Sequence, residues 1–223
     1  MTAAAGDAER SSTPPVRTTV HLVRHGEVFN PEGILYGRLP GFELSAHGRV
    51  QAERVAAHLA SADVAVVLAS PLERAQQTAA PVAALHGVEV LTEPRLIESG
   101  NAFEGTHVSV GDGALRHPEN WPLLRNPFRP SWGEPYLEIA HRMLGAAHRA
   151  RALAAGREAV CVSHQLPVWT LRRFLAGQHL WHNPRSRQCS LGSVTSVVFD
   201  DESVVDIAYA EPGGASDPSV TGA

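Results

Sequence analysis

The stretch that most constrains the fold covers residues 19–27. Its first half is rich in β-forming side chains, and Gly26 interrupts the run directly after Arg24 and His25. This pattern predicts a buried strand over 19–24 that places a guanidinium and an imidazole at its carboxyl end. In open α/β sheets ligands bind at that edge. A guanidinium suits phosphate oxygens, and a neutral imidazole can attack phosphorus, although a histidine at a strand end is more often structural.

Apolar runs alternate with amphipathic stretches along the rest of the chain. Short apolar runs bounded by Gly, Pro or Ser are typical of buried strands, and apolar residues spaced three or four apart are typical of helices. We therefore predict an α/β fold, a three-layer α/β/α sandwich with a mostly parallel sheet and an antiparallel edge. The predicted strands are 19–24, 64–68, 88–91, 158–163, 191–199 and 203–209, of which the last two form a hairpin.

Four helices are predicted between these strands. They cover residues 46–60, 71–86, 135–155 and 166–176. We expect Ser45 to cap the first helix and Ser70 to cap the second, with Pro71 at the first helical position of the latter. Pro81 lies inside the second helix and is expected to kink or divide it, because proline cannot donate the backbone hydrogen bond.

The domain organisation follows from local composition. Residues 1–16 and 211–223 have little to bury and are predicted to be disordered tails around a single domain, 17–210. Within that domain, residues 101–133 combine several prolines with tryptophan and phenylalanine, which predicts an insertion or lid folded over the sheet. The Gly- and Pro-punctuated loop at 30–40 is long for a connector, and such loops often bind ligands.

Composition excludes several classes of function. A net charge of −4 argues against a nucleic-acid or membrane-surface role, since both require a basic face. There is no signal-peptide pattern and no membrane-spanning apolar run, and two distant cysteines suit a reducing compartment. We expect a cytoplasmic protein, with a homodimer left open. The twelve histidines show no metal-ligand spacing, so no metal or cofactor is expected.

Three further stretches place polar side chains at predicted strand ends. Arg74 falls in the first turn of a helix, where the helix N-terminus already favours anions. His164 follows the strand at 158–163, and Glu98 follows the third strand in a glycine-containing loop. Each has an ordinary interpretation when taken alone: a surface ion pair, a structural histidine and a solvated acid.

Taken together, these stretches resemble the histidine phosphatase superfamily, also called the phosphoglycerate mutase-like family. The matching motifs are LVRHGE, ASPLERAQQTA, RLIE…FEG and VSH, and they occur in family order over residues 18–209. The resemblance implies that His25 is the nucleophile and becomes phosphohistidine. It further implies that Glu98 protonates the leaving group and that three residues bind the phosphoryl group: Arg24, Arg74 and His164. Two guanidinium groups and a protonated His164 would supply the positive charge that this group needs without metal.

The sequence also departs from the family pattern. Val28 stands where a threonine is common, and Asn30, a candidate phosphate contact, lies one place closer to the motif than usual. The loop after Glu98 is one residue short, which leaves Glu104 as an alternative acid, and Gln165 replaces a common glycine. The Glu-Arg-His-Tyr-Gly stretch of true mutases is absent, and this favours a phosphatase.

The most specific prediction is a phosphomonoesterase that acts on a small phosphorylated molecule. Phosphoglycerate mutase-type transfer and non-catalytic phospho-ligand binding are the alternatives. The sequence argues against a cysteine phosphatase, because neither Cys161 nor Cys189 has the arginine six residues later that such enzymes require. Substrate contacts are expected from Tyr36 and Arg38 of the 30–40 loop. Arginines of the insertion are candidates for a second anionic group of the substrate: Arg116, Arg125 and Arg129.

Overall fold

A six-stranded mixed sheet forms the centre of the computed structural model, which describes residues 14–107 and 133–214. The strand order is β3-β2-β4-β1-β5-β6; the first four strands run parallel, and β5 and β6 form an antiparallel hairpin at one edge. The predicted fold class is thereby confirmed. The strands are β1 (Arg17–Arg24), β2 (Val64–Ala69), β3 (Val90–Thr92), β4 (Glu158–Ser163), β5 (Val194–Asp200) and β6 (Ser203–Ala210).

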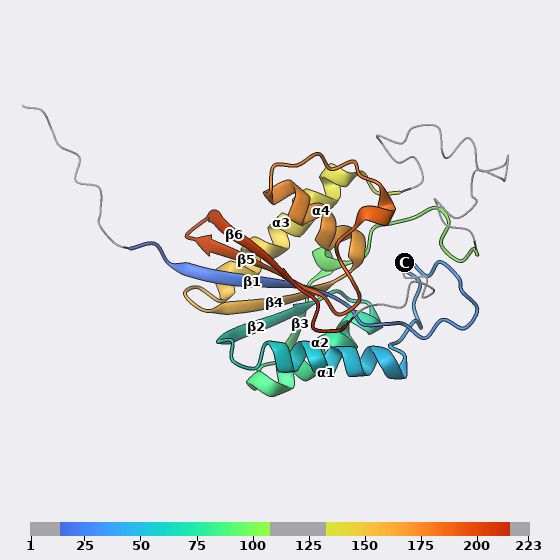
Figure 1. Ribbon diagram of the computed structural model, residues 1–223, viewed down its shortest axis with the longest axis horizontal. Helices are drawn as coiled ribbons and strands as arrows, with labels where there is room; N and C mark the ends of the chain where they lie inside the picture. Colours follow the sequence, from blue (N-terminus) through green and yellow to red (C-terminus); the bar gives the residue numbers. More distant parts are fainter. Residues whose placement is uncertain (1–13, 108–132, 215–223) are drawn as a thin grey trace, which may run out of the picture.

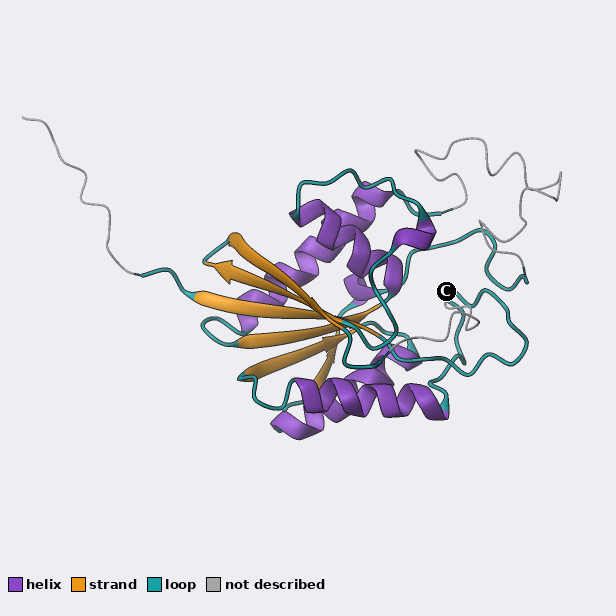
Figure 2. Ribbon diagram, in the orientation of Figure 1, coloured by secondary structure: helices purple, strands orange, loops and turns teal. Residues whose placement is uncertain are grey.

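Helices cover both faces of this sheet and make the three layers visible in Figures 1 and 2. One face carries α1 (Ala46–His58) and α2 (Glu73–His86), whose apolar side chains share a core with Val23 and Val67. The opposite face carries α3 (Tyr136–Leu153) and α4 (Gln165–Leu175), packed on Leu22 and Leu68. Neighbouring residues of one strand therefore enter different cores, as the alternation of side chains in a strand requires.

The start of α2 corrects the sequence-based prediction. Ser70 does not cap this helix: α2 begins at Glu73 after Leu72, and the Ser70 hydroxyl instead lies 2.8 Å from the imidazole of His164. The helix also runs through Pro81 undivided. Its face on either side of the proline is packed into the sheet core, and that packing offsets the one backbone hydrogen bond that proline cannot make.

A close backbone contact holds the first turn of α1 against the loop that follows β1. A Cβ atom built on Gly26 would lie 2.5 Å from the carbonyl oxygen of Gly48, and one built on Gly48 would lie 2.0 Å from that of Glu27. Only glycine fits at both positions. The Glu27 carboxylate completes this junction by accepting a hydrogen bond from Ser45, the N-cap of α1.

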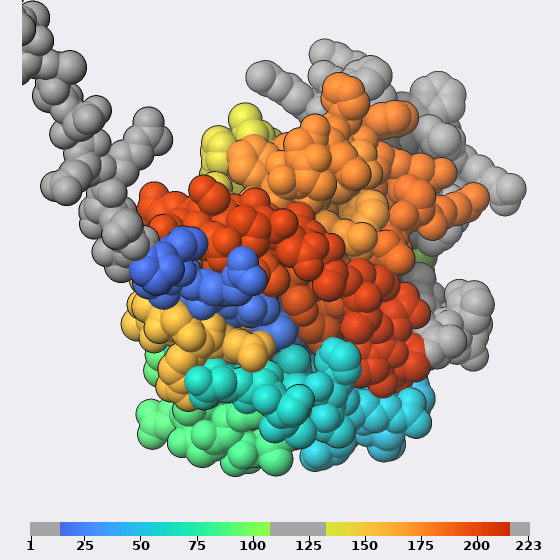
Figure 3. All heavy atoms as spheres, turned by 60° about the vertical axis from the view of Figure 1, so that its left-hand side comes forward, coloured from blue at the N-terminus to red at the C-terminus, as the bar shows by residue number. Residues whose placement is uncertain are grey.

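The first strand of the chain and its last two strands are neighbours in the sheet. Figure 3 shows the N-terminal strand (blue) next to the C-terminal strands (red), and β1 pairs directly with β5. Beyond β6 the chain stays attached, because the amide of Gly213 donates to the Gly192 carbonyl oxygen. None of the described helices is both long and apolar enough to cross a membrane.

Candidate active site

The carboxyl ends of β1, β2 and β4 meet at one edge of the sheet, on the right of Figure 1. Backbone hydrogen bonds fix the residues that follow them: the amide of His25 donates to the Ser163 carbonyl oxygen at 3.0 Å, and that of Ser70 donates to the Val162 carbonyl oxygen at 2.9 Å. His164 follows β4 directly. Three separate segments thus deliver polar side chains to one place, as the parallel topology predicts.

His25 is held as a neutral imidazole with a defined tautomer. Its Nδ1 lies 2.7 Å from the Gly26 carbonyl oxygen, which can only accept, so Nδ1 carries the proton and Nε2 keeps its lone pair. Burial, followed by the positive charges of Arg74 and Arg24, lowers the pKa of His25 well below its usual value. The ring therefore presents an unprotonated nitrogen at neutral pH.

Arg24 and Arg74 are buried beside His25, with exposed fractions of 4% and 0%. Each guanidinium uses one nitrogen to bond a backbone carbonyl: Arg24 donates to Cys189 at 2.8 Å, and Arg74 to Gly37 at 2.6 Å. Other buried donors have no hydrogen-bond partner in the described part of the chain, namely Arg24 Nε and both Nε and Nη1 of Arg74. Buried donors without partners are costly, which makes this cluster a place for an anion.

His164 completes the cluster, but in a different charge state from the one expected. Its ring lies edge-on to His25, with centroids 5.0 Å apart, and its Nε2 is 2.8 Å from the Ser70 hydroxyl. Burial, then the charge of Arg74, lowers the pKa of His164 well below its usual value. The expectation of a protonated His164 is therefore wrong for the free site. A neutral ring that accepts from Ser70 still has Nδ1–H, which is buried without a described partner, to offer an anion.

Glu98 lies in the loop after η1 (Pro94–Leu96) and is 4% exposed. Its Oε1 accepts hydrogen bonds from the amide and the hydroxyl of Ser99, at 2.7 and 3.2 Å, whereas Oε2 is buried with no partner among the described residues. The negative charge of Glu98 acts to raise the pKa of the nearby Arg74 guanidinium. The alternative acid, Glu104, instead accepts from the Asn101 amide at 3.2 Å. The geometry thus favours Glu98 as the carboxyl group of the site.

Arg38, a predicted substrate contact, holds the backbone of this loop. Its Nε donates to the Glu98 carbonyl oxygen at 2.7 Å, and its Nη2 pairs with Glu134 at 2.9 Å. Arg142 of α3 donates from Nε to the other oxygen of the Glu134 carboxylate, Oε1, at 2.7 Å, and from Nη1 to the Ile97 carbonyl oxygen at 2.7 Å. The two arginines and Glu134 therefore fix the chain on both sides of the candidate acid.

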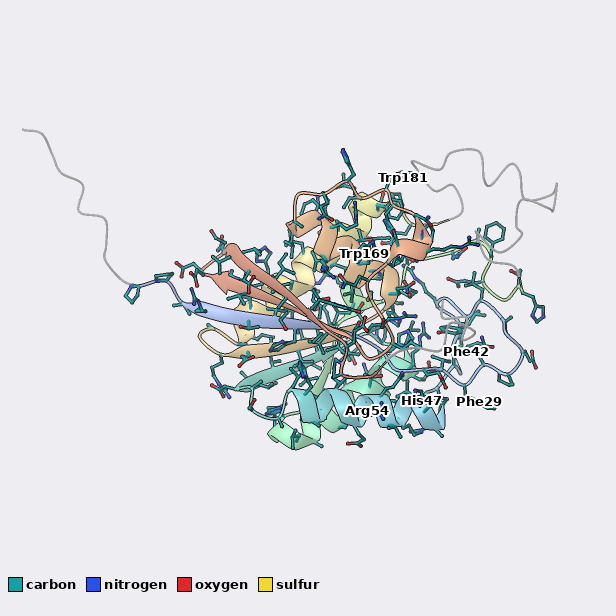
Figure 4. All side chains as sticks on the ribbon, viewed as in Figure 1. Phe29, Phe42, His47, Arg54, Trp169 and Trp181 are labelled. Carbon is teal, nitrogen blue, oxygen red and sulfur yellow. The ribbon has the colours of Figure 1, made fainter. Side chains whose placement is uncertain are left out.

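Tyr36 and Asn30, two other predicted substrate contacts, lie in the loop beyond the sheet edge. Tyr36 is buried; the Arg74 guanidinium stands 4.7 Å from its ring centre, and the ring stacks on Phe42, labelled in Figure 4. The Asn30 amide is occupied within its own loop, because it both donates to and accepts from the backbone of Ile34. Tyr36 thus supports a site arginine, and these contacts give no support to phosphate binding by Asn30.

Sequence reasoning missed several residues that support the site. Thr78 lies one helical turn after Arg74; its hydroxyl donates to the Arg74 carbonyl oxygen at 2.7 Å and accepts from the Gly26 amide at 3.1 Å. Its four-residue spacing from Arg74 was a usable signal, whereas the Ser70–His164 pair depends on tertiary structure.

The insertion arginines Arg116, Arg125 and Arg129 lie outside the described residues. Within the described ranges, no group of three His, Cys, Asp or Glu side chains is arranged to hold a metal.

Similarity to known proteins agrees with this geometry. A family model described as histidine phosphatase superfamily (branch 1) matches residues 20–209. The chain belongs to this superfamily. Among curated relatives, "Probable phosphoglycerate mutase GpmB" of Escherichia fergusonii is 31% identical over 183 residues, which cover 78% of this chain and 83% of the relative.

Two mycobacterial proteins are also similar. "Uncharacterized protein Rv0525" of Mycobacterium tuberculosis (strain ATCC 25618 / H37Rv) is 61% identical over 198 residues, covering 89% of this chain and 98% of the relative. The solved structure of mycobacterial glucosyl-3-phosphoglycerate phosphatase Rv2419c aligns with a TM-score of 0.69 at 22% identity, covering 86% of this chain and 97% of that one. At that identity the solved structure shows a shared fold.

Proposed function

We propose that this superfamily member is a phosphomonoesterase that works through a phosphohistidine at His25. The observation that supports it most is a set of buried side-chain nitrogens that surround a neutral imidazole and have no partner among the described residues: Arg24 Nε, Arg74 Nε and Nη1, and His164 Nδ1. A phosphoryl group carries its charge on three oxygens, and positioned donors in a water-poor site stabilise such charge strongly. A bound phosphoryl group would supply the acceptors that these donors lack.

In the first step, the lone pair on His25 Nε2 attacks phosphorus, and the bond from phosphorus to the alcohol oxygen breaks. The leaving oxygen takes its proton from Glu98, whose Oε2 has no partner among the described residues and is free to carry that proton. The guanidinium donors hold the phosphoryl oxygens while charge moves across them. The Gly26 carbonyl keeps the His25 proton on Nδ1, so the attacking nitrogen stays available.

In the second step, water attacks phosphorus, and the bond from phosphorus to Nε2 breaks. The electron pair returns to His25, and Glu98, now a carboxylate, accepts the proton that the water loses. The products are the free alcohol and inorganic phosphate, and the enzyme regains its starting protonation. Every proton and charge in this cycle is handled by side chains of the cluster, so we propose that turnover requires no metal or cofactor.

Phosphoglycerate mutase-type transfer is the second candidate, and the relative from Escherichia fergusonii carries that name. In that case an alcohol oxygen of the product, instead of water, would take the phosphoryl group from His25. The absence of the mutase stretch Glu-Arg-His-Tyr-Gly favours hydrolysis. We further propose a small phosphorylated substrate and a cytoplasmic location; two free, buried cysteines, Cys161 and Cys189, suit a reducing compartment.

Two assays separate the candidates. The purified protein is first incubated with 4-nitrophenyl phosphate, and release of nitrophenol is followed. It is then incubated with 3-phosphoglycerate, and inorganic phosphate and 2-phosphoglycerate are measured in the same sample. Hydrolysis of the aryl ester with phosphate release supports the phosphatase, and isomerisation without phosphate release supports the mutase. Absence of both reactions, with phosphate still bound, would indicate a non-catalytic binding protein.

A further inference from the structure

A further cation, the half-buried Arg187, lies next to the candidate active site, and it has no carboxylate partner among the described residues. Arg187, in the segment between η4 (Pro184–Ser186) and β5, donates from Nε to His182 Nε2 at 2.9 Å and from Nη1 to Gln165 Oε1 at 3.3 Å. The charge of Arg187 also acts to lower the pKa of Tyr136, against the larger raising effect of burial. Within the described ranges, no Asp or Glu lies within ion-pair distance of this guanidinium. In the described part of the chain, its side-chain hydrogen bonds therefore go to neutral groups.

The hydrogen-bond partners of Arg187 fix the orientation of its guanidinium. The His182 Nδ1 donates to the Leu180 carbonyl oxygen at 2.7 Å, so Nε2 is the nitrogen that accepts from Arg187. Burial, with the charges of Arg187 and Arg173, lowers the pKa of His182 to about 4. The ring stays neutral at physiological pH and packs against Tyr136 and Trp169, the latter labelled in Figure 4.

Direct contacts connect Arg187 to the phosphoryl cluster. Gln165 follows His164 in sequence, and its Nε2 reaches the Cys189 carbonyl oxygen at 3.5 Å. The same carbonyl accepts the hydrogen bond from Arg24 at 2.8 Å. The negative charge of Glu98 acts to raise the pKa of Arg187, and the positive charge of Arg24 acts to lower it. All three groups are therefore close enough to interact electrostatically. Gln165 thus lies between the two cationic groups.

We propose that Arg187 is a specificity-determining residue that binds a second anionic group of the substrate. The substrate class is a phosphomonoester whose alcohol portion carries a carboxylate or a second phosphate. The phosphoryl group to be cleaved contacts Arg24, Arg74 and His164. The second anionic group contacts the planar guanidinium fork of Arg187, whose paired N–H donors suit both a carboxylate and a phosphate. Gln165 and His182 are positioning residues for that fork. This inference rests on the proposed function for the location of the first phosphoryl group.

Inhibition of 4-nitrophenyl phosphate hydrolysis tests the proposal. The inhibitors are 2-phosphoglycolate and 3-phosphoglycerate, which carry a carboxylate, 2,3-bisphosphoglycerate, which carries both kinds of group, and glycerol 3-phosphate, which has no second anion. For the wild type we expect at least one of the first three to bind about tenfold or more tightly than glycerol 3-phosphate, a difference of about 1.4 kcal/mol. Arg187→Gln should remove that advantage and change kcat/KM for the aryl ester less than about threefold.

Arg173→Gln is the matched control, because it removes the same charge from α4, where Arg173 bonds the His179 carbonyl oxygen. It should leave the inhibitor preference intact. Arg187→Lys keeps the charge without the fork and serves as the second variant if Arg187→Gln does not fold; it should weaken the preference. His182→Gln tests positioning and should lower the preference with little effect on kcat for the aryl ester.

Three results would overturn the proposal: no inhibitor preference in the wild type, a preference that survives in the Arg187 variants, or an equal loss for singly and doubly anionic ligands. The last result would place Arg187 on the cleaved phosphoryl group itself. Failure of the proposed function looks different, because the wild type would then not hydrolyse the aryl ester at all. In that case the same four compounds are compared by calorimetric binding to wild type and Arg187→Gln.

Discussion

Two histidines four residues apart, His21 and His25, show how a structural polar cluster differs from a candidate active site. His21 lies within β1 and is almost fully buried, yet both ring nitrogens have partners: Ser196 Oγ at 2.8 Å and Glu158 Oε2 at 2.6 Å. His25 follows the same strand and has one carbonyl partner and two neighbouring guanidinium groups. Burial is similar, but the surrounding charge has the opposite sign.

The pKa values reflect this contrast. Burial lowers the pKa of both imidazoles, but Glu158 opposes that effect at His21, whereas Arg74 and Arg24 add to it at His25. The His21 cluster is complete without a ligand. The His25 cluster leaves several buried donors unpartnered among the described residues, and we infer that an anion completes it.

The largest expected effect comes from removing the nucleophile. His25→Ala should reduce kcat for 4-nitrophenyl phosphate by about a thousandfold or more, because no second nucleophile stands beside the two arginines. The fold should persist, and inorganic phosphate should still bind weakly through Arg24, Arg74 and His164. Steady-state kinetics and thermal denaturation check both points. Retention of more than about a hundredth of wild-type turnover would remove His25 from the mechanism.

Removing His21 should lower the stability of the protein and leave its activity intact, the reverse of what is expected for His25. His21→Leu leaves Ser196 and the Glu158 carboxylate without their partner, so the free energy of unfolding should fall by about 1–3 kcal/mol. kcat/KM per folded molecule should stay within about twofold of wild type, since His21 takes no part in the cluster at the sheet edge. Urea denaturation and the aryl phosphate assay measure the two quantities. A loss of activity without a loss of stability would contradict the distinction between the clusters.

The sequence predicted the sheet edge well because hydrophobic runs and glycine breaks are local signals. The strand ends place three site residues, Arg24, His25 and His164. Because parallel strands bring their carboxyl ends together, this proximity can be predicted without knowing any side-chain contact. The start of α2 was missed because Ser70 prefers His164 over the helix it precedes, a choice made by tertiary structure. The charge of His164 was missed for the same reason, since desolvation depends on packing.

Loop residues were the least predictable part of the site. Arg38 had the residue type and position of a ligand contact, but it bonds the Glu98 backbone and Glu134, which lies far away in sequence. Arg187 was not singled out at all, because the segment around it has no periodicity and its partners, His182 and Gln165, are brought to it by the fold. Such contacts follow from the fold and cannot be identified from spacing.

The pH dependence of stability should separate the two histidines more finely. A histidine has a pKa of about 6.5 when unfolded, and in the folded protein the pKa is lowered at both sites, further at His25. Between the lowered pKa and about 6.5 the unfolded chain binds a proton that the folded chain does not, so stability falls as the pH drops below about 6.5.

Replacement of His25 by Asn should flatten that slope by up to about 1.4 kcal/mol per pH unit, and replacement of His21 should flatten it less. Urea denaturation between about pH 5 and pH 7 gives the slopes. Equal slopes for wild type and His25→Asn would show that His25 is not held neutral by burial and the two arginines.

The smallest expected effect is that of chelation. Because the positive charge around His25 is assigned to side chains, EDTA should leave kcat/KM for the aryl ester unchanged within error. The control is the same protein dialysed against buffer without chelator. A loss that one particular divalent ion restores would mean that a metal, in addition to the arginines, neutralises the phosphoryl group.

The central claim is that His25 carries the phosphoryl group during turnover, and trapping the phosphoenzyme tests it most directly. Wild type, His25→Ala and His21→Leu are mixed with a substrate labelled in its phosphoryl group, quenched in alkaline detergent and analysed by mass spectrometry. We predict an acid-labile, base-stable phosphate on His25 in wild type and His21→Leu, and no label in His25→Ala. A label on any other residue, or equal labelling of His25→Ala, would contradict the account.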